Sequence, residues 1–196
     1  MRFPIIAILC CVVAAAFAAP ASAGPAKELI QSLASAATPV LNDKDISSAE
    51  RAQRMQDILR PAFDRDEMAK SLLGRYWLRA TPEQQTELIV LLESYLVNAY
   101  ASRVDSIEGH VAFDIQGETA SGGRTMVASV VIRPQEPPVR VDWQVEDIGG
   151  THSVTDIIVE GVSLVVSQRA DFASVIRQRG GIDGLIGLLR DRVGKP

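Results

Sequence analysis

The stretch Asp156–Phe172, DIIVEGVSLVVSQRADF, decides how the chain is organised. It begins as an apolar strand, is interrupted at Glu160-Gly161, and continues with apolar residues at helical spacing. Hardly any of its side chains could take part in covalent chemistry. We therefore expect this stretch to join a sheet to a helix and to supply apolar surface rather than a catalytic centre.

The first 23 residues have the pattern of a cleaved signal peptide. Arg2 supplies a positive charge, Ile5–Phe17 is an apolar run, and Ala21–Ala23 matches a signal-peptidase site. The run is shorter than the roughly 20 apolar residues that a membrane-spanning helix needs. We expect cleavage near Ala23, periplasmic localisation of residues 24–196, and loss of both cysteines with the signal. A mature chain without cysteine has no disulfide.

The net charge of the chain argues against some classes of binding partner. The formal net charge of the chain is −4 at pH 7. An acidic protein is poorly suited to bind nucleic acid or a strongly anionic membrane surface, so we expect neither as a standing partner.

Signals for helices come first in the chain. Pro25 and the apolar residues that follow it predict a helix that ends at Pro39. Capping boxes, in which an Asp, Ser or Thr precedes a Glu or Gln by three residues, open three more helices at Ser47–Glu50, Asp64–Glu67 and Thr81–Gln84. The helix after Thr81 is apolar around more than a third of its circumference, so one side should face the core and another a neighbouring lobe or an apolar ligand.

From residue 109 the apolar period changes to two. Four such segments, separated by turns, predict a four-stranded antiparallel meander over about 109–160. Helical spacing returns over about 162–192. We predict the α+β class and one domain over 24–196, with a helical lobe over about 24–108 and helices covering the sheet.

Side chains that could perform chemistry are few. His110 and His152 lack metal-ligand spacing, and we interpret them as unrelated residues at strand starts. The carboxylates within 64–67 suit the first turn of a helix. No P-loop or nucleophile elbow is present, and Gly161–Ser163 is only half of such an elbow. The sequence predicts no enzyme, no metal and no cofactor, and Ser163 is expected to cap or line the start of a helix.

Arginines offer two interpretations. Arg75 and Arg79 flank Tyr76–Leu78, and Arg103 follows the long helix. Arginine beside exposed aromatic residues suits a phosphate or lipid headgroup. Alternatively, the arginines are solvated surface charges and the aromatic residues belong to the core.

Ordered motifs resemble the MlaC family of periplasmic phospholipid-transfer proteins over about residues 28–190. They are Phe63-Asp64, Leu73-Gly74, Trp77, Thr81–Gln85, Asp156, Val159–Leu164, Arg169, Phe172 and Gly181–Ile186. The chain departs from the family pattern at four positions. Trp143 stands where tyrosine is usual, and His152, Thr155 and Gln168 stand where the family usually has tryptophan, an aromatic residue and tyrosine, respectively. We therefore expect the cavity or its rim to be remodelled.

The resemblance implies an NTF2-like sheet packed with helices around an apolar lipid cavity. It implies a soluble monomer with lipid as cargo and no cofactor, which exchanges phospholipid with an inner-membrane ABC transporter complex and an outer-membrane lipoprotein complex. We predict that the lipid-binding residues are Leu88, Ile89, Leu92, Leu96, Val127, Val131, Val141, Trp143, Val159, Val162 and Val165.

Three alternatives stay open at this point. An HpnM-like branch shares the fold, so the cargo could be a hopanoid or another polycyclic lipid. The chain could instead be a ligand-free interaction module of a membrane assembly. It could also be an exported enzyme with Asp156 as a base. A charged residue in place of Leu92 should separate a carrier, which would lose its lipid, from an adaptor, which would lose only stability.

Overall fold

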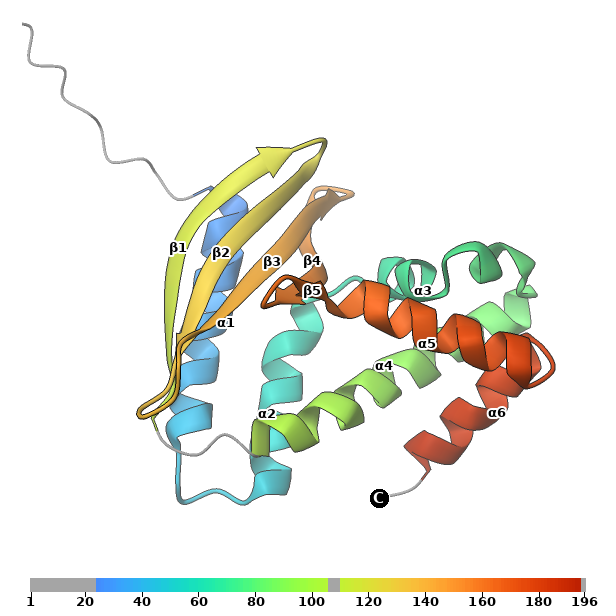
Figure 1. The fold of residues 1–196 in the computed structure, drawn as a ribbon, viewed down its shortest axis with the longest axis horizontal. Coiled ribbons are helices and arrows are strands. Elements are labelled where there is room, and N and C mark those ends of the chain that lie inside the picture. The colour runs from blue at the N-terminus through green and yellow to red at the C-terminus, as the bar shows by residue number, and fades with distance from the viewer. Residues whose placement is uncertain (1–23, 106–109, 195–196) are drawn as a thin grey trace, which may run out of the picture.

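The computed structural model describes residues 24–105 and 110–194, with the side chains of 24–96 and 110–194 (Figure 1). The predicted signal peptide, with Cys10 and Cys11, lies outside the described residues. Within them, none of the helices is long and apolar enough to cross a membrane.

Helices pack against and beside one antiparallel sheet, which confirms the α+β class. The α-helices are α1 (Pro25–Asn42), α2 (Ser48–Leu59), α3 (Arg65–Leu73), α4 (Pro82–Asp105), α5 (Leu164–Gln178) and α6 (Ile182–Val193), and two short 3₁₀ helices are η1 (Arg60–Ala62) and η2 (Gly74–Arg79). The strands are β1 (Ala112–Ser121), β2 (Arg124–Ile132), β3 (Val139–Ile148), β4 (Thr151–Val159) and β5 (Val162–Ser163). They pair in the order of the sequence.

The sheet has five strands rather than the four predicted. The fifth, β5, contains only two residues, which is too short for a periodicity to reveal. It forms because Glu160 and Gly161 have φ angles of 49° and 80° and make a two-residue hairpin turn. Val159 then pairs with Val162.

One face of the sheet is covered by α1, which runs along it in Figure 1. A buried cluster joins Ala26, Ile30 and Leu33 of α1 to Val127, Val145 and Val154 of the sheet. These contacts make α1 and the sheet one layered unit.

The sequence predicted that the first helix ends at Pro39. In the structure, α1 continues to Asn42. The Asn42 side chain donates to the carbonyl of Val111 at 2.9 Å and accepts from its N–H at 2.7 Å. Leu41 is buried beside it. These contacts at the end of α1 outweigh the one helical hydrogen bond that Pro39 removes.

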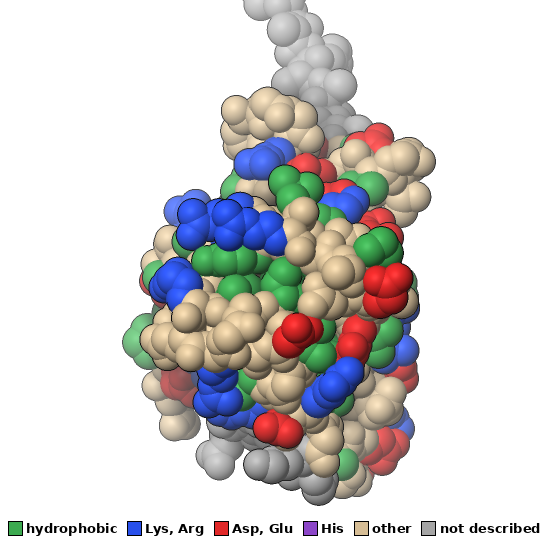
Figure 2. All heavy atoms as spheres, turned by 90° about the vertical axis from the view of Figure 1, so that its right-hand side faces the viewer, with side chains coloured by type: hydrophobic (Ala, Val, Ile, Leu, Met, Phe, Trp, Pro, Cys, Tyr) green, Lys and Arg blue, Asp and Glu red, His purple; other side chains and the backbone are tan. Residues whose placement is uncertain are grey.

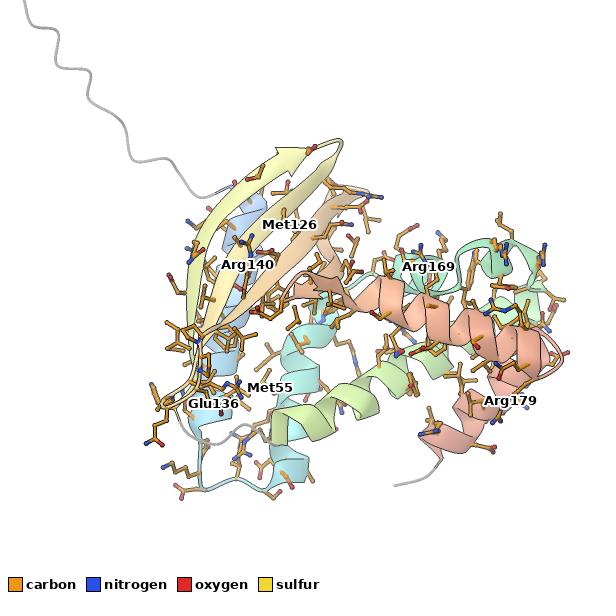
Figure 3. All side chains as sticks on the ribbon, in the orientation of Figure 1. Met55, Met126, Glu136, Arg140, Arg169 and Arg179 are labelled. Atoms are coloured by element: carbon orange, nitrogen blue, oxygen red, sulfur yellow. The ribbon has the colours of Figure 1, made fainter. Side chains whose placement is uncertain are left out.

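Most of the other helices form a second core beside the sheet. Its buried members come from α3, η2, α4, α5 and α6, and they include Leu72, Leu88, Leu92, Phe172, Ile176, Leu185 and Leu189. The rings of Tyr95 and Phe172 meet edge to face with centroids 5.7 Å apart. In Figure 3, Arg169 extends from α5 towards α3, where its Nε donates to the Ser71 carbonyl at 2.6 Å.

All three predicted capping boxes are confirmed as helix starts. The side chains of Ser47, Asp64 and Thr81 accept hydrogen bonds from the backbone N–H groups three residues later. At Thr81 the bonding is reciprocal, because the Gln84 side chain accepts from the Thr81 N–H at 3.0 Å. These caps fix where α2, α3 and α4 begin.

Candidate functional site

A cavity of about 280 Å³ lies where the last strands of the sheet meet the helices. Its walls come from α2, η1, α3, α4, β4 and α5. The apolar residues that line it are Ala52, Met55, Leu59, Phe63, Met68, Leu72, Leu96, Ile157, Leu164 and Val165. The polar and charged ones are Gln56, Arg60, Arg65, Glu93, Thr155, Asp156 and Gln168.

One wall of the cavity is a single face of α2. Ala52, Met55, Gln56 and Leu59 stand at positions i, i+3, i+4 and i+7, which share one side of a helix. The sequence predicted this helix from its capping box, but this wall was not predicted. The spacing of Met55 and Leu59 was visible, but a cavity wall and an ordinary core stripe have the same spacing.

Of the predicted lipid-binding residues, Leu96 and Val165 line the cavity. Leu88 and Leu92 are fully buried in the helical core, and Ile89 packs against the same core. That side of α4 faces the protein interior, so it does not line this cavity.

The predicted residues of the sheet have other neighbours. Val127 and Trp143, which pair across β2 and β3, belong to the cluster covered by α1. Val131 packs near Met55 and Val111 in a third cluster, and Val141 is buried. Periodicity showed that this face is buried, but it did not show that α1 buries it.

The last two predicted residues lie on the β4–β5 hairpin. Val159 is half-buried, and the Val162 residue is 57% exposed. Neither lines the cavity, and lipid binding by them stays a prediction, as it does for the rest of the set.

Asp156 is held by the chain itself. Its carboxylate accepts from the Ser163 hydroxyl at 2.5 Å and from the backbone N–H groups of Ile157 and Val165 at 2.8 and 3.1 Å. Ser163 in turn accepts from the Val166 N–H at 3.0 Å and caps α5, as the sequence predicted. Three donors around one carboxylate favour a structural role for Asp156 over the role of a general base.

Two positions that depart from the MlaC pattern form part of the cavity wall. Thr155 donates a hydrogen bond to Glu146 at 3.1 Å and accepts one from Gln144 at 3.0 Å. The Gln168 side-chain oxygen is buried and has no hydrogen-bond partner among the described residues. These substitutions therefore change the surface that a ligand would meet.

Three charged residues of the cavity are joined. The Glu93 carboxylate on α4 pairs with Arg60 Nε of η1 at 3.1 Å and with Arg65 Nε of α3 at 2.6 Å. The side chains of Arg60 and Arg65 are 54% and 47% exposed, whereas that of Glu93 is 16% exposed. The arginines therefore lie at the solvent edge of the cavity.

The arginines singled out from the sequence do not line it. The guanidinium carbons of Arg75 and Arg79 lie 5.1 and 5.8 Å from the centre of the Tyr76 ring, and this ring is buried. Arg75 also donates to the Tyr76 hydroxyl at 3.3 Å, which lowers the pKa of the phenol. Core aromatic residues under surface arginines are thus the better of the two interpretations, and the Arg103 side chain lies outside those described.

Figure 2 views the molecule from the side where α5 and α6 lie in Figure 1, and Lys and Arg side chains lie around an apolar patch there.

In the described part of the chain, no group of three or more His, Cys, Asp or Glu residues is placed to hold a metal ion.

Fold and site together define an α+β protein with a mainly apolar cavity between a sheet and a helical lobe. The MlaC protein family matches residues 31–191, and the chain belongs to this family.

Known proteins that are similar to this chain include the following two. The toluene tolerance protein ttg2D of Pseudomonas putida is 26% identical over 136 residues, which are 66% of this chain and 63% of that protein. The chain thus spans less than two thirds of that relative. A phospholipid-binding protein from Ralstonia solanacearum, solved in complex with a phospholipid, is 25% identical with a TM-score of 0.76. The superposition covers 88% of this chain and 98% of that structure.

Proposed function

We propose that this protein is a phospholipid carrier that holds acyl chains in the cavity between β4, α2, α3, α4 and α5. The observation that carries the proposal is this mainly apolar cavity in a fold shared with a protein solved in complex with a phospholipid. Apolar walls with a few polar groups are the usual composition of a site for an apolar ligand.

The energetics suit a carrier. Two acyl chains with roughly 30 methylenes gain about 24 kcal/mol when they leave water, at about 0.8 kcal/mol for each CH₂. A bilayer shields the same chains, so transfer between a membrane and an apolar cavity is close to balanced. Direction must then come from the partners that donate and accept the lipid, and the cavity needs no reactive group.

The cavity volume bears on how the chains enter. About 280 Å³ lies just below the range of roughly 300–1,000 Å³ that ligand pockets span. A lipid with two long chains needs more room, so we infer that the surrounding helices separate as the lipid enters.

We also propose the compartment and the partner complexes of the carrier. The carrier acts in the periplasm after removal of residues 1–23, as a monomer, and exchanges lipid with an inner-membrane ABC transporter complex and an outer-membrane lipoprotein complex. Family membership and the predicted signal peptide support this setting.

A pair of variants on one helix tests the site. Leu96→Glu places a charge in the cavity, whereas Val90→Glu places one at an exposed position of the same α4. After incubation with phospholipid vesicles, native mass spectrometry should show lipid on the wild type and on Val90→Glu, with at least about tenfold less on Leu96→Glu. Equal lipid on all three would place the lipid elsewhere. With vesicles that also contain a polycyclic lipid, uptake of that lipid alone would favour the hopanoid alternative.

A further inference from the structure

The cavity has a charged edge. Arg60 and Arg65 line it, and about half of each side chain is exposed. Leu72 and Met55 line the same cavity and are buried. The cavity therefore passes from buried apolar walls to an edge that carries two guanidinium groups.

Glu93 fixes these two groups in place. One of its carboxylate oxygens pairs with Arg60 Nε and the other with Arg65 Nε. Each guanidinium also carries two terminal nitrogens, which the pairs with Glu93 do not use. Among the described residues, no other carboxylate pairs with either arginine. Two positive charges around one negative charge give this cluster of three residues a net charge of +1.

Asp156 also lines the cavity, but it pairs with neither arginine. Its carboxylate accepts hydrogen bonds from Ser163 and from the backbone N–H of Val165 at the start of α5. Donors at the start of a helix stabilise a negative charge. That carboxylate is therefore stabilised by donors other than the two arginines, which stay available to a ligand at the edge of the cavity.

A second ion pair that involves α4 serves for comparison, because it joins two helices outside the cavity. Arg190 of α6 pairs with Glu87 at 2.6 Å, and its side chain is 62% exposed. One cation faces one anion there, and neither residue lines the cavity. The Glu93 cluster differs by its extra arginine and by its position at the cavity mouth.

We propose that Arg60 and Arg65, held by Glu93, bind the phosphate group of the lipid whose acyl chains occupy the cavity. Guanidinium groups suit this task because their planar arrays of N–H donors match phosphate oxygens. This inference rests on the proposed function and adds a preference: the protein selects lipids with a phosphate over neutral lipids with the same chains.

The test is competition between lipids that differ only in the headgroup. The protein is incubated with detergent micelles that contain equal amounts of phosphatidylcholine, phosphatidylglycerol and diacylglycerol with identical chains, and bound lipid is counted by native mass spectrometry. The wild type should carry at least about tenfold more of each phospholipid than of diacylglycerol. A preference for phosphatidylglycerol alone would reflect net charge and would overturn the inference.

Variants assign the preference to the two arginines. The double variant R60Q/R65Q should bind all three lipids about equally, and R60K/R65K, which keeps the charge but loses the planar donors, should fall between it and the wild type. R190Q removes a comparable surface ion pair and should keep the wild-type ratio. Circular dichroism establishes that each variant is folded, and the lysine variant serves if the glutamine variant is not.

The outcomes separate this inference from the proposed function. Equal binding of the three lipids by the wild type, or an unchanged ratio in both arginine double variants, would overturn the phosphate site and leave the carrier intact. Binding of no lipid at all would overturn the carrier as well. Saturable binding of inorganic phosphate without a headgroup preference would mark a site for free phosphate, which contradicts the inference.

Discussion

The Ser163 hydroxyl donates a hydrogen bond of 2.5 Å to the Asp156 carboxylate, and it also caps α5 through the Val166 N–H. This contact ties β4 to the helix that follows the β4–β5 hairpin. It lies in the stretch that joins sheet and helix, and it positions Val165, which lines the cavity.

Replacement of Ser163 by alanine should lower the free energy of unfolding by about 1–2 kcal/mol, since a lost helix cap alone costs up to about 2. Urea denaturation measures the change. Ser167→Ala is the control: this hydroxyl donates to the Ser163 carbonyl on the exposed side of α5, and its loss should change stability by less than about 0.5 kcal/mol. Equal effects of the two variants would contradict the linking role of Ser163.

The two glycines of α6 should respond in opposite directions to alanine. A Cβ on Gly184 would lie 1.8 Å from the Arg179 carbonyl oxygen, whereas a Cβ on Gly187 meets nothing within 4 Å. Gly184→Ala should destabilise by about 1–3 kcal/mol through overpacking, and Gly187→Ala should stabilise by about 0.5–1 kcal/mol through helix propensity. Thermal unfolding of both variants checks the prediction, and stabilisation by Gly184→Ala would refute the close approach of Gly184 to the Arg179 carbonyl.

Ser129 bridges two strands inside the sheet. It is fully buried, donates to the Val141 carbonyl at 2.6 Å and accepts from Trp143 Nε1 at 3.0 Å. Ser129→Ala leaves the indole N–H without its partner and should cost about 1–3 kcal/mol. Adding Trp143→Phe removes that donor, so the double variant should cost less than the sum of the two single ones. Additive costs in denaturant titrations would show that the bond contributes little.

Leu92 and Leu96 lie one helical turn apart on α4, but their replacement should have different effects. Changes at Leu92 should lower stability, whereas changes at Leu96 should lower lipid binding. Leu92→Ala should cost about 2–5 kcal/mol of stability, because the side chain is buried in the helical core. The fraction of folded protein that carries lipid should stay unchanged, because Leu92 does not line the cavity. Denaturation combined with native mass spectrometry separates the two quantities, and a loss of lipid without a loss of stability would move Leu92 into the binding site.

The elements of this fold were readable wherever local chemistry sets them. Capping side chains such as Asp64 mark helix starts through bonds three residues away, and period two marks strands. The strand β5 was not predicted, because two residues are too few to show a period. The extension of α1 past Pro39 was not predicted either. It depends on the hydrogen bonds between the Asn42 side chain and the backbone of Val111, which is distant in sequence.

The cavity was predictable only in part for a similar reason. A pattern of apolar residues shows that a surface is buried, but not whether a helix or a ligand buries it. Val127 therefore looked like Leu96, although α1 covers the former and the latter lines the cavity. The Glu93 cluster joins η1, α3 and α4, and nothing in the local sequence around Arg60 or Arg65 indicates that these segments meet.

The lipid content of the protein tests most directly whether the cavity holds a phospholipid. The protein is exported to the periplasm of a bacterial host, purified without detergent, and weighed intact by native mass spectrometry before and after extraction with organic solvent. We predict a bound mass that matches one phospholipid and is lost from Leu96→Glu but retained by Val90→Glu. An unliganded mass for the wild type, together with no uptake from phospholipid vesicles, would contradict the account.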